Sequence, residues 1–387
     1  MSDGAGDQAM RWEGRAVRAD AVAGRLLDLR HIASDEEGFP LARASVMNLI
    51  VYVERQSQVK PAVREVDELA VRHPSRAVVV APEPGTRFSL DAEVILRRHP
   101  LATHGLVFER VLLRPRGASP EGLDTLVIPL LIPHLQSFLW WLSDPDPADP
   151  ALQSLMSICD RLIVDSSLGR AERLGALATL LVGAPRLKRG DTGLPRLVLG
   201  DLAWTRLESF RSALARVFDE GGRAEYLPGL ESVEIVGSRG QSSPPTPSEL
   251  LFAGWIGSRL GYARPMPARG GVSLQAEATG RRTLFTFIGR EAHTRTSAPD
   301  LHPLHAFKLV ASRGRRRLEA GFRADGGSGH LLLQEGKTKR IDRTQPQPAL
   351  EETEVLSREL ARFGRDTIYE ESLAMGARIE AVLPTPD

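Results

Sequence analysis

The chain has 387 residues, with 50 basic and 49 acidic side chains that leave a net charge of +1, and 42% of its residues are hydrophobic. This length favours two domains over one, and the apolar content is ordinary for a protein with real cores. The near-zero net charge argues against a general polyanion binder, so we expect no nucleic-acid partner. A single cysteine, Cys159, excludes an internal disulfide.

The first segment, Met1–Gly14, is polar and rich in glycine, and we expect it to be mobile. Its opening residues, MSDGAGDQAM, lack the apolar core of a signal peptide, which predicts a cytoplasmic protein. Two apolar strands are expected at Ser45–Val53 and Arg76–Ala81, with a helix at Val59–Arg72 between them. A strand, helix and strand in about forty residues form a βαβ unit, so these strands should be parallel.

The most apolar stretch is Leu123–Asp149, which has no Asp, Glu, Lys or Arg from Thr125 to Leu142. A membrane helix needs roughly 20 apolar residues, and this run is shorter, so we expect no membrane partner. A single long core helix would break at Pro133. The stretch therefore predicts a helix that ends near Leu131, a turn, and a strand at Ser137–Leu142 that is buried on both faces.

Further strands are expected at Phe88–Arg97 and Leu106–Arg114, joined as an antiparallel hairpin across His99 to Gly105. A helix at Ala151–Ile158 and a buried strand at Arg161–Asp165 complete this half. Residues 1–168 therefore predict an α/β domain: a mixed, mainly parallel sheet with flanking helices.

Beyond a boundary near Gly169, the sequence predicts a different architecture. Asp201 stands at the N-cap position of a helix over Leu202–Asp219, and Ser248 stands there for a helix over Glu249–Leu260. Period-two patterns then predict strands at Glu231–Val236, Val272–Ala278, Thr283–Ile288, Ala306–Ser312, Arg316–Arg323 and His330–Gln334.

The chain closes with a helical region over Leu350–Leu383, in which Gly364 and Gly376 are weak points. Residues 169–387 therefore predict an α+β domain with an antiparallel sheet and a C-terminal helical region.

Several motifs fall short of a catalytic or cofactor site. Gly336-Lys337-Thr338 matches the end of a phosphate-binding loop, but Leu331 replaces the required earlier glycine. Gly326 to His330 misses the nucleophile elbow by its last residue, and no G-x-G-x-x-G follows the first strands. His302 and His305, with His293 nearby, lack a cysteine or acidic cluster for zinc. We expect no catalytic residue, cofactor or metal.

Two features keep a functional alternative open. Asp144 and Asp146 follow the buried strand as D-x-D, the pattern by which some glycosyltransferases hold a metal and a nucleotide sugar, although flanking prolines favour a plain turn. Arg313-Gly-Arg-Arg-Arg317 is a concentrated positive patch that suits either a solvated hairpin turn or an anchor for an acidic partner. Cys159 is expected to be a small core residue.

An ordered set of stretches resembles the OpcA family of glucose-6-phosphate dehydrogenase assembly proteins. They are ARASVMNLIVYV (Ala42–Val53), HPSRAVVV (His73–Val80), PHLQSFLWWLSDPDP (Pro133–Pro147), CDRLIVDSS (Cys159–Ser167), GDLAWTRLESFRSALARVFD (Gly200–Asp219) and ELLFAGWIGSRLGY (Glu249–Tyr262). The resemblance covers about Ala42 to Tyr262 and thins beyond it.

The resemblance implies a non-catalytic subunit that binds glucose-6-phosphate dehydrogenase and promotes its assembly and activation in the oxidative pentose phosphate pathway. In photosynthetic members, cysteines link activation to thioredoxin; with Cys159 alone, an intramolecular dithiol switch is impossible here. Trp and Arg are favoured interface anchors, so the candidate interface residues are Trp204, Arg206, Arg313, Arg315, Arg316 and Arg317. A place in the core suits Trp204 equally well. The alternative is a metal-dependent glycosyltransferase that uses Asp144 and Asp146.

Overall fold

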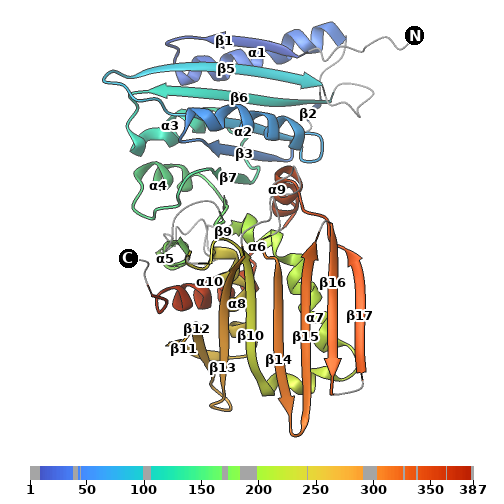
Figure 1. Ribbon diagram of the computed structural model, residues 1–387. Coiled ribbons are helices and arrows are strands. Elements are labelled where there is room, and N and C mark those ends of the chain that lie inside the picture. Colours follow the sequence, from blue (N-terminus) through green and yellow to red (C-terminus); the bar gives the residue numbers. More distant parts are fainter. Residues whose placement is uncertain are drawn as a thin grey trace, which may run out of the picture. The chain divides into compact units, whose positions relative to one another are not determined.

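Figure 1 shows the computed structural model of the chain. The structure describes residues 9–37, 42–43, 45–98, 106–167, 173–183, 198–241, 243–290, 303–325, 327–336, 339–362 and 364–384. Its contacts divide the chain into two compact units. Unit 1 comprises Met1–Val164, Ala184–Gly200 and Leu356–Gly364; unit 2 comprises Asp165–Gly183, Asp201–Val355 and Arg365–Asp387. The chain passes from one unit to the other several times, whereas the sequence predicted a single domain boundary near Gly169.

Unit 1 is built on a mixed nine-stranded sheet, sheet A. Its strands are β1 (Met10–Gly14), β2 (Ala42–Arg43), β3 (Met47–Tyr52), β4 (Ser75–Val80), β5 (Ser89–Arg98), β6 (Leu106–Arg116), β7 (Ser137–Trp141), β8 (Arg161–Val164) and β9 (Val198–Asp201). Their order is β1-β5-β6-β4-β3-β7-β8-β9, with β2 beside β6. β3 pairs in parallel with both β4 and β7, and β5 and β6 form an antiparallel hairpin, so the mixed, mainly parallel sheet is confirmed.

Helices cover both faces of sheet A. They are α1 (Ala19–Glu37), α2 (Gln56–Leu69), η1 (Pro120–Gly122), α3 (Leu123–Val127), η2 (Ile128–Leu130) and α4 (Pro150–Met156). Glu109 and Arg110 are neighbours on β6 and therefore point to opposite faces. Glu109 pairs with Arg30 of α1, and Arg110 pairs with Asp67 of α2, so these two helices lie on opposite faces.

The central strand β7 confirms the expectation for the apolar stretch. Every residue of Ser137–Trp141 is buried, and the helix before it breaks into short turns around Pro129. Trp141 stacks on Tyr52 of β3 with ring centroids 4.0 Å apart, and its indole Nε1 donates to the Asp144 carbonyl oxygen. Both tryptophans therefore belong to the core of unit 1.

The expectation that Met1–Gly14 is mobile is wrong for its last five residues. Met10–Gly14 forms β1, which pairs antiparallel with β5. Met10, Trp12 and Gly14 are the more covered positions of the strand, an alternation typical of a half-buried edge. Residues 1–8 lie outside the described residues.

Unit 2 is built on an eight-stranded sheet, sheet B, in the order β11-β12-β13-β10-β14-β15-β16-β17. Its strands are β10 (Leu230–Ser238), β11 (Tyr262–Ala268), β12 (Gly271–Ala276), β13 (Arg282–Arg290), β14 (Ala306–Arg313), β15 (Arg316–Asp325), β16 (Ser328–Glu335) and β17 (Lys339–Pro346). All neighbours pair antiparallel except β10 and β13, which are parallel. The sheet is therefore antiparallel, as predicted, except at the one pair of β10 and β13.

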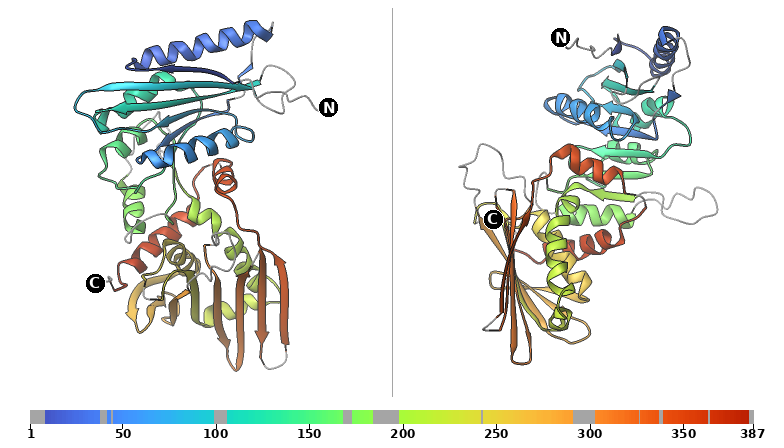
Figure 2. Two further views of the ribbon diagram at one scale, coloured as in Figure 1. Left: turned by 45° about the horizontal axis from the view of Figure 1, so that its top comes forward. Right: turned by 90° about the vertical axis from the view of Figure 1, so that its right-hand side faces the viewer.

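The helices of unit 2 lie along one face of sheet B, as Figure 2 shows with the sheet seen on edge. They include α5 (Arg173–Gly183), α6 (Leu202–Arg206), α7 (Glu208–Asp219), η3 (Arg223–Gly229), α8 (Pro247–Arg259) and α10 (Thr367–Glu380); α9 (Glu352–Leu360) begins in unit 2 and ends in unit 1. Along β15, buried residues alternate with partly or fully exposed ones, so the opposite face of the sheet carries the polar set.

Local sequence explains the helix boundaries of unit 2. The predicted helix over Leu202–Asp219 is two helices that meet at Leu207. The cap of α8 is Thr246 rather than Ser248, because Thr246 and Glu249 form a reciprocal capping box. The C-terminal region breaks near Gly364, as predicted, where the backbone has φ of +76°.

The expectation that Gly376 weakens the C-terminal helix is wrong. Gly376 and Gly254 lie where α10 crosses α8, and the two backbones nearly touch. A methyl group on Gly254 would lie 2.2 Å from the Ser372 carbonyl oxygen and 2.7 Å from the Gly376 nitrogen. The two glycines therefore permit the close packing of these helices.

Candidate functional site

A cluster of polar side chains lies in unit 2 where its three segments begin. Asp165 and Asp201 are the first residues of two segments, and Asp366 is the second residue of the last. Together with Trp204, Arg206 and Tyr369, to which they are hydrogen bonded, we call these residues the entry cluster. The cluster fastens the starts of the three segments to one another within unit 2.

Asp201 is the buried centre of the entry cluster. Its Oδ1 accepts from the backbone N–H groups of Ser166 and Ala203, both at 3.0 Å, and its Oδ2 accepts from the Tyr369 hydroxyl at 3.2 Å. The predicted N-cap role is confirmed. Burial, and then the nearby Asp165 charge, raise the pKa of Asp201 to about 6. The cluster can therefore take up a proton near neutral pH.

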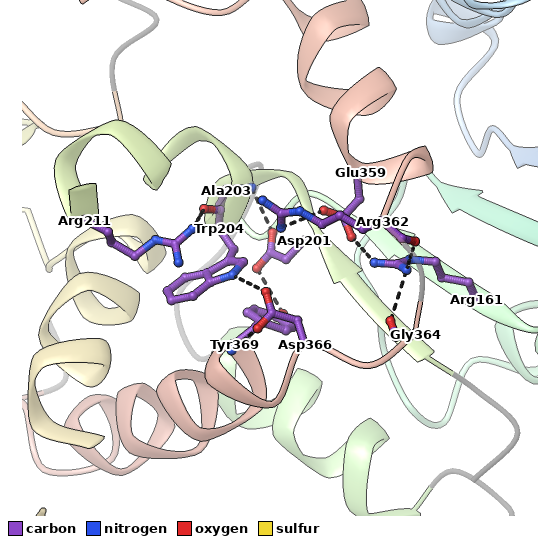
Figure 3. Close-up of polar contacts among 10 residues, drawn as sticks. All are labelled: Arg161, Asp201, Ala203, Trp204, Arg211, Glu359, Arg362, Gly364, Asp366 and Tyr369. Atoms are coloured by element: carbon purple, nitrogen blue, oxygen red, sulfur yellow. Dashed lines mark hydrogen bonds and ion pairs between the residues drawn. The ribbon is translucent and has the colours of Figure 1, made fainter. Parts of the chain in front are cut away.

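Trp204 lies in the core, which is the second of the two places that its sequence left open. It is only 1% exposed, and its indole Nε1 donates to Asp366 Oδ2 at 2.9 Å. The guanidinium of Arg211 lies over the indole ring, 3.4 Å from its centroid (Figure 3). The spacing from Trp204 to Leu207 already places this tryptophan on the apolar face of its helix.

Arg206 is mostly buried by its ion pairs in unit 2. Its Nη1 donates to Asp165 Oδ2 at 2.7 Å and its Nη2 donates to Glu352 Oε2 at 2.6 Å. Burial raises the pKa of Glu352, although the Arg206 charge opposes that rise. Because both ends of the guanidinium are engaged, Arg206 holds α6 and the start of α9 together and has little freedom to bind another protein.

A second polar cluster lies within unit 1, on the segment Leu356–Gly364. Arg161 of β8 pairs with Glu359, and its Nη1 donates to the Arg362 carbonyl oxygen at 2.8 Å (Figure 3). Gly200 makes room for this pair, since a methyl group there would lie 2.3 Å from Glu359 Oε1. The ion pair fastens this late segment to sheet A.

The Arg313–Arg317 turn is exposed, as an anchor for an acidic partner would have to be. It joins β14 to β15 through Gly314, whose φ is +60°. Arg313 pairs with Glu225, and Arg317 donates to Glu319 at 3.1 Å. Arg315 and Arg316 form no ion pair with the described residues. The turn therefore presents two guanidinium groups to solvent.

The D-x-D pattern forms a plain turn. Asp146 Oδ1 accepts from the backbone N–H of Ala148 at 2.8 Å, which closes a local turn of its own, and the Asp144 carbonyl oxygen holds the Trp141 indole. Among the described residues, no three His, Cys, Asp or Glu side chains gather as a metal site. These contacts give the Asp146 side chain and the Asp144 backbone structural roles in the turn.

The other residues that the sequence singled out are Cys159, the phosphate-loop and nucleophile-elbow near-matches, and the histidines. Cys159 is buried, as expected of a core residue. Lys337, Thr338, Gly326, His293, His302 and residues 99–105 lie outside the described residues. Within the part of the chain that the structure describes, no helix is both long and apolar enough to span a membrane.

Sequence reasoning missed most of the entry cluster. Asp165 ends a predicted strand, and Asp366 and Tyr369 lie in the predicted C-terminal helical region, far along the chain from Asp201. The one local signal was Asp201 before an apolar helix, which marks a cap and says nothing of its distant partners.

Two family models match the chain. The model described as the glucose-6-phosphate dehydrogenase subunit N-terminal domain matches residues 66–180, and the corresponding C-terminal domain model matches residues 198–373. Together they cover most of both units.

Similar proteins that carry the name OpcA, and whose names refer to the OxPP cycle, come from Nostoc punctiforme, Synechocystis and Synechococcus elongatus. The chain is 26% identical to the one from Nostoc punctiforme over 335 residues, which are 82% of this chain and 67% of that protein. It is 24% identical to the one from Synechocystis over 80% of this chain and 64% of that protein. The one from Synechococcus elongatus is 28% identical over 69% of this chain, and the match spans 58% of that protein.

A solved structure of glucose-6-phosphate dehydrogenase with glucose-6-phosphate aligns over 88% of both chains, with 9% identity and a TM-score of 0.44. That score is too low to bear on fold or activity. The family models and the relatives agree with the ordered stretches from Ala42 to Tyr262, and the chain belongs to the OpcA family.

Proposed function

We propose that this chain is a non-catalytic subunit that binds glucose-6-phosphate dehydrogenase and promotes its assembly and activation in the oxidative pentose phosphate pathway. The observation that carries the proposal is the match of both family models, each described as a domain of a glucose-6-phosphate dehydrogenase subunit. The names of the relatives, which refer to the OxPP cycle, support the same pathway.

The chemistry of the polar clusters supports a binding role over a catalytic one. Asp201 is fully engaged by hydrogen-bond donors, and Arg206 and Arg161 are held by carboxylates of their own unit. Side chains that are saturated by internal partners are poorly placed to activate a substrate. Activation of another enzyme requires only that this chain binds the active state of that enzyme more tightly than the inactive state.

The exposed Arg313–Arg317 turn is our proposed contact with the dehydrogenase. Arg315 and Arg316 are free to form charged hydrogen bonds with carboxylates of a partner, and arginine is favoured in such contacts. Trp204 and Arg206 are set aside, because the first is buried and the second is held by two ion pairs.

Sedimentation of the mixed proteins tests the proposal. The chain and the dehydrogenase of the same organism, mixed at about micromolar concentration, should sediment as a complex heavier than either protein alone. The Arg315→Glu/Arg316→Glu double variant should bind at least about tenfold more weakly, because it replaces two attractive charges with repulsive ones.

Arg269→Glu is the matched control, since Arg269 is also an exposed arginine beside a glycine in a hairpin turn of sheet B. The control should bind like the wild type. Separate sedimentation of the two wild-type proteins would contradict the proposed function. Equal binding by the double variant and the wild type would contradict only the proposed surface.

A further inference from the structure

A small cavity of about 160 Å³ lies in unit 2 between the end of α7 and the strands β16 and β17. Three arginines, Arg216, Arg223 and Arg343, line it together with one carboxylate, Glu220. Leu333 and Ile341 contribute an apolar wall. The lining therefore carries more positive than negative charge, and we call this cavity the arginine pocket.

Arg223 is the buried charge of the pocket. It is only 4% exposed, and its Nη1 donates to the backbone carbonyl oxygens of Val217, at 3.2 Å, and Glu220, at 3.0 Å. No carboxylate of the described residues forms an ion pair with it, and its buried Nε has no acceptor. A buried guanidinium without a counter-ion is costly, so a bound anion would stabilise it.

The other two arginines stand nearer the solvent. Arg216 is exposed, and among the described residues its side chain has one hydrogen bond, to the neutral Gln345, whose Oε1 lies 3.5 Å from Arg216 Nη1. Arg343 donates from Nη1 to both oxygens of Glu220, at 3.2 and 2.9 Å. Glu220 thus neutralises one arginine of the three, and two positive charges remain for a ligand.

Charge and volume together define the ligand class. Guanidinium groups match phosphate oxygens well, and two uncompensated charges suit a dianion. The cavity is smaller than the 300 Å³ or so at which sites for drug-sized ligands begin, which leaves no room for a nucleotide. We propose that the arginine pocket binds a small phosphate monoester whose carbon chain lies against Leu333 and Ile341. This site is independent of the contact with the dehydrogenase.

Calorimetric titration of the full chain with glycerol 3-phosphate tests the proposal. At constant ionic strength we expect saturable binding to one site, no binding of glycerol, and weaker binding of inorganic phosphate, which lacks the carbon chain. Arg216→Gln and Arg343→Gln should each weaken binding about tenfold, as expected for loss of a charged hydrogen bond. Arg323→Gln, an exposed arginine on the other face of sheet B, should bind like the wild type.

Glu220→Gln makes the test sharper, because its expected effect has the opposite sign. It removes the lining carboxylate and frees Arg343, so glycerol 3-phosphate should bind several-fold more tightly. A damaged fold could not produce that gain.

The absence of binding up to about 10 mM, a level weaker than most metabolite sites, would overturn the proposal. So would unchanged affinity in both Arg216→Gln and Arg343→Gln, or weaker binding by Glu220→Gln. Equal affinity for inorganic phosphate and glycerol 3-phosphate would overturn the role of the apolar wall.

Discussion

The two sheets of this molecule use their faces differently. In sheet A, helices cover both faces, and a central strand such as β7 is buried at every position. In sheet B, helices lie along one face, and β15 alternates buried residues with more exposed ones. Side chains that are free to meet another molecule are therefore more plentiful on sheet B, and both of our proposed binding surfaces lie in unit 2.

The charged residues of the two sheets differ in the same way. Glu109 of sheet A is almost fully buried, and it pairs with Arg76 at 2.5 Å and Arg30 at 3.0 Å. Arg323 and Lys308 of sheet B are exposed, and each forms a long ion pair of 3.7 Å. Removing one partner of a buried ion pair is strongly destabilising, whereas an exposed ion pair contributes only about 0–1 kcal/mol to the stability of the fold. Buried charges of sheet A such as Glu109 thus hold the fold, whereas exposed charges of sheet B such as Arg323 and Lys308 contribute little to it.

The largest expected effect comes from the tryptophans of β7. Trp140→Ala and Trp141→Ala should each lower the free energy of unfolding by about 3–5 kcal/mol, the usual cost of truncating a buried tryptophan. Leu332→Ala, on the outer face of sheet B where Leu332 is 41% exposed, should cost less than about 1 kcal/mol. Thermal melting of the three variants checks the comparison. A tryptophan variant that melts like the wild type would show that β7 is not covered on both faces.

The second effect concerns Asp201 and depends on pH. Its pKa is about 6 in the fold and 3.8 ordinarily, so the folded state holds the proton more tightly. The stability it contributes is fully present below pH 3.8 and is lost as pH rises through 6, a change of roughly 3 kcal/mol. Asp201→Asn keeps a capping side chain and cannot ionise. The free energy of unfolding of the variant, relative to that of the wild type, should therefore be higher at pH 7.5 than at pH 4.5.

Chemical denaturation of both proteins at these two pH values checks this expectation. Other buried acids, such as Glu249, also have a raised pKa, but they are common to both proteins and cancel in the difference. A stability difference between variant and wild type that is the same at both pH values would contradict the assignment of the raised pKa to Asp201.

The third effect compares two helical glycines. Gly254→Ala should destabilise unit 2 by about 1–3 kcal/mol, because its methyl group would meet the backbone of α10 and force the helices apart. Gly24→Ala in α1, where no atom apart from the neighbouring residues and backbone of the same helix lies within 4 Å of the new methyl group, should instead stabilise by about 0.5–1 kcal/mol. Denaturant unfolding measures both. Effects of the same sign would show that α8 and α10 do not pack as closely as described.

The smallest effect is expected at the turn after β7. Asp146→Ala removes one exposed hydrogen bond, from the Ala148 N–H, and should cost about 0.5–1 kcal/mol without changing activation of the dehydrogenase. Melting and activation assays on the same sample check this. A normally folded variant that no longer activates would make the turn a functional site.

Much of the fold could be predicted because the local patterns were strong. The run from Phe138 to Leu142 is wholly apolar, and alternating Asp and Pro follow directly after Ser143, which marks a buried strand and its end. Two of the strands missed, β11 and β17, have weak patterns. β11 contains Pro265 and Pro267, which an edge strand tolerates, and β17 has one aliphatic residue, Ile341, among charged and polar ones.

The sites were harder to predict because they depend on distant contacts. Asp201 was predicted as a cap, but its hydrogen bond to Tyr369 joins residues 168 positions apart. The parallel pairing of β10 with β13 and the arginine pocket likewise arise only when remote segments meet. For Trp204 the sequence left an interface and the core open, although its helical spacing with Leu207 favours the core.

The central claim is that this chain activates glucose-6-phosphate dehydrogenase by binding it. The most direct measurement is the rate of the purified dehydrogenase at fixed substrate while the chain is titrated in. We predict a saturable rise in rate with wild-type chain and with Arg269→Glu, and a rise shifted to at least about tenfold higher concentration with Arg315→Glu/Arg316→Glu. A rate that stays constant at every concentration of wild-type chain would contradict the account.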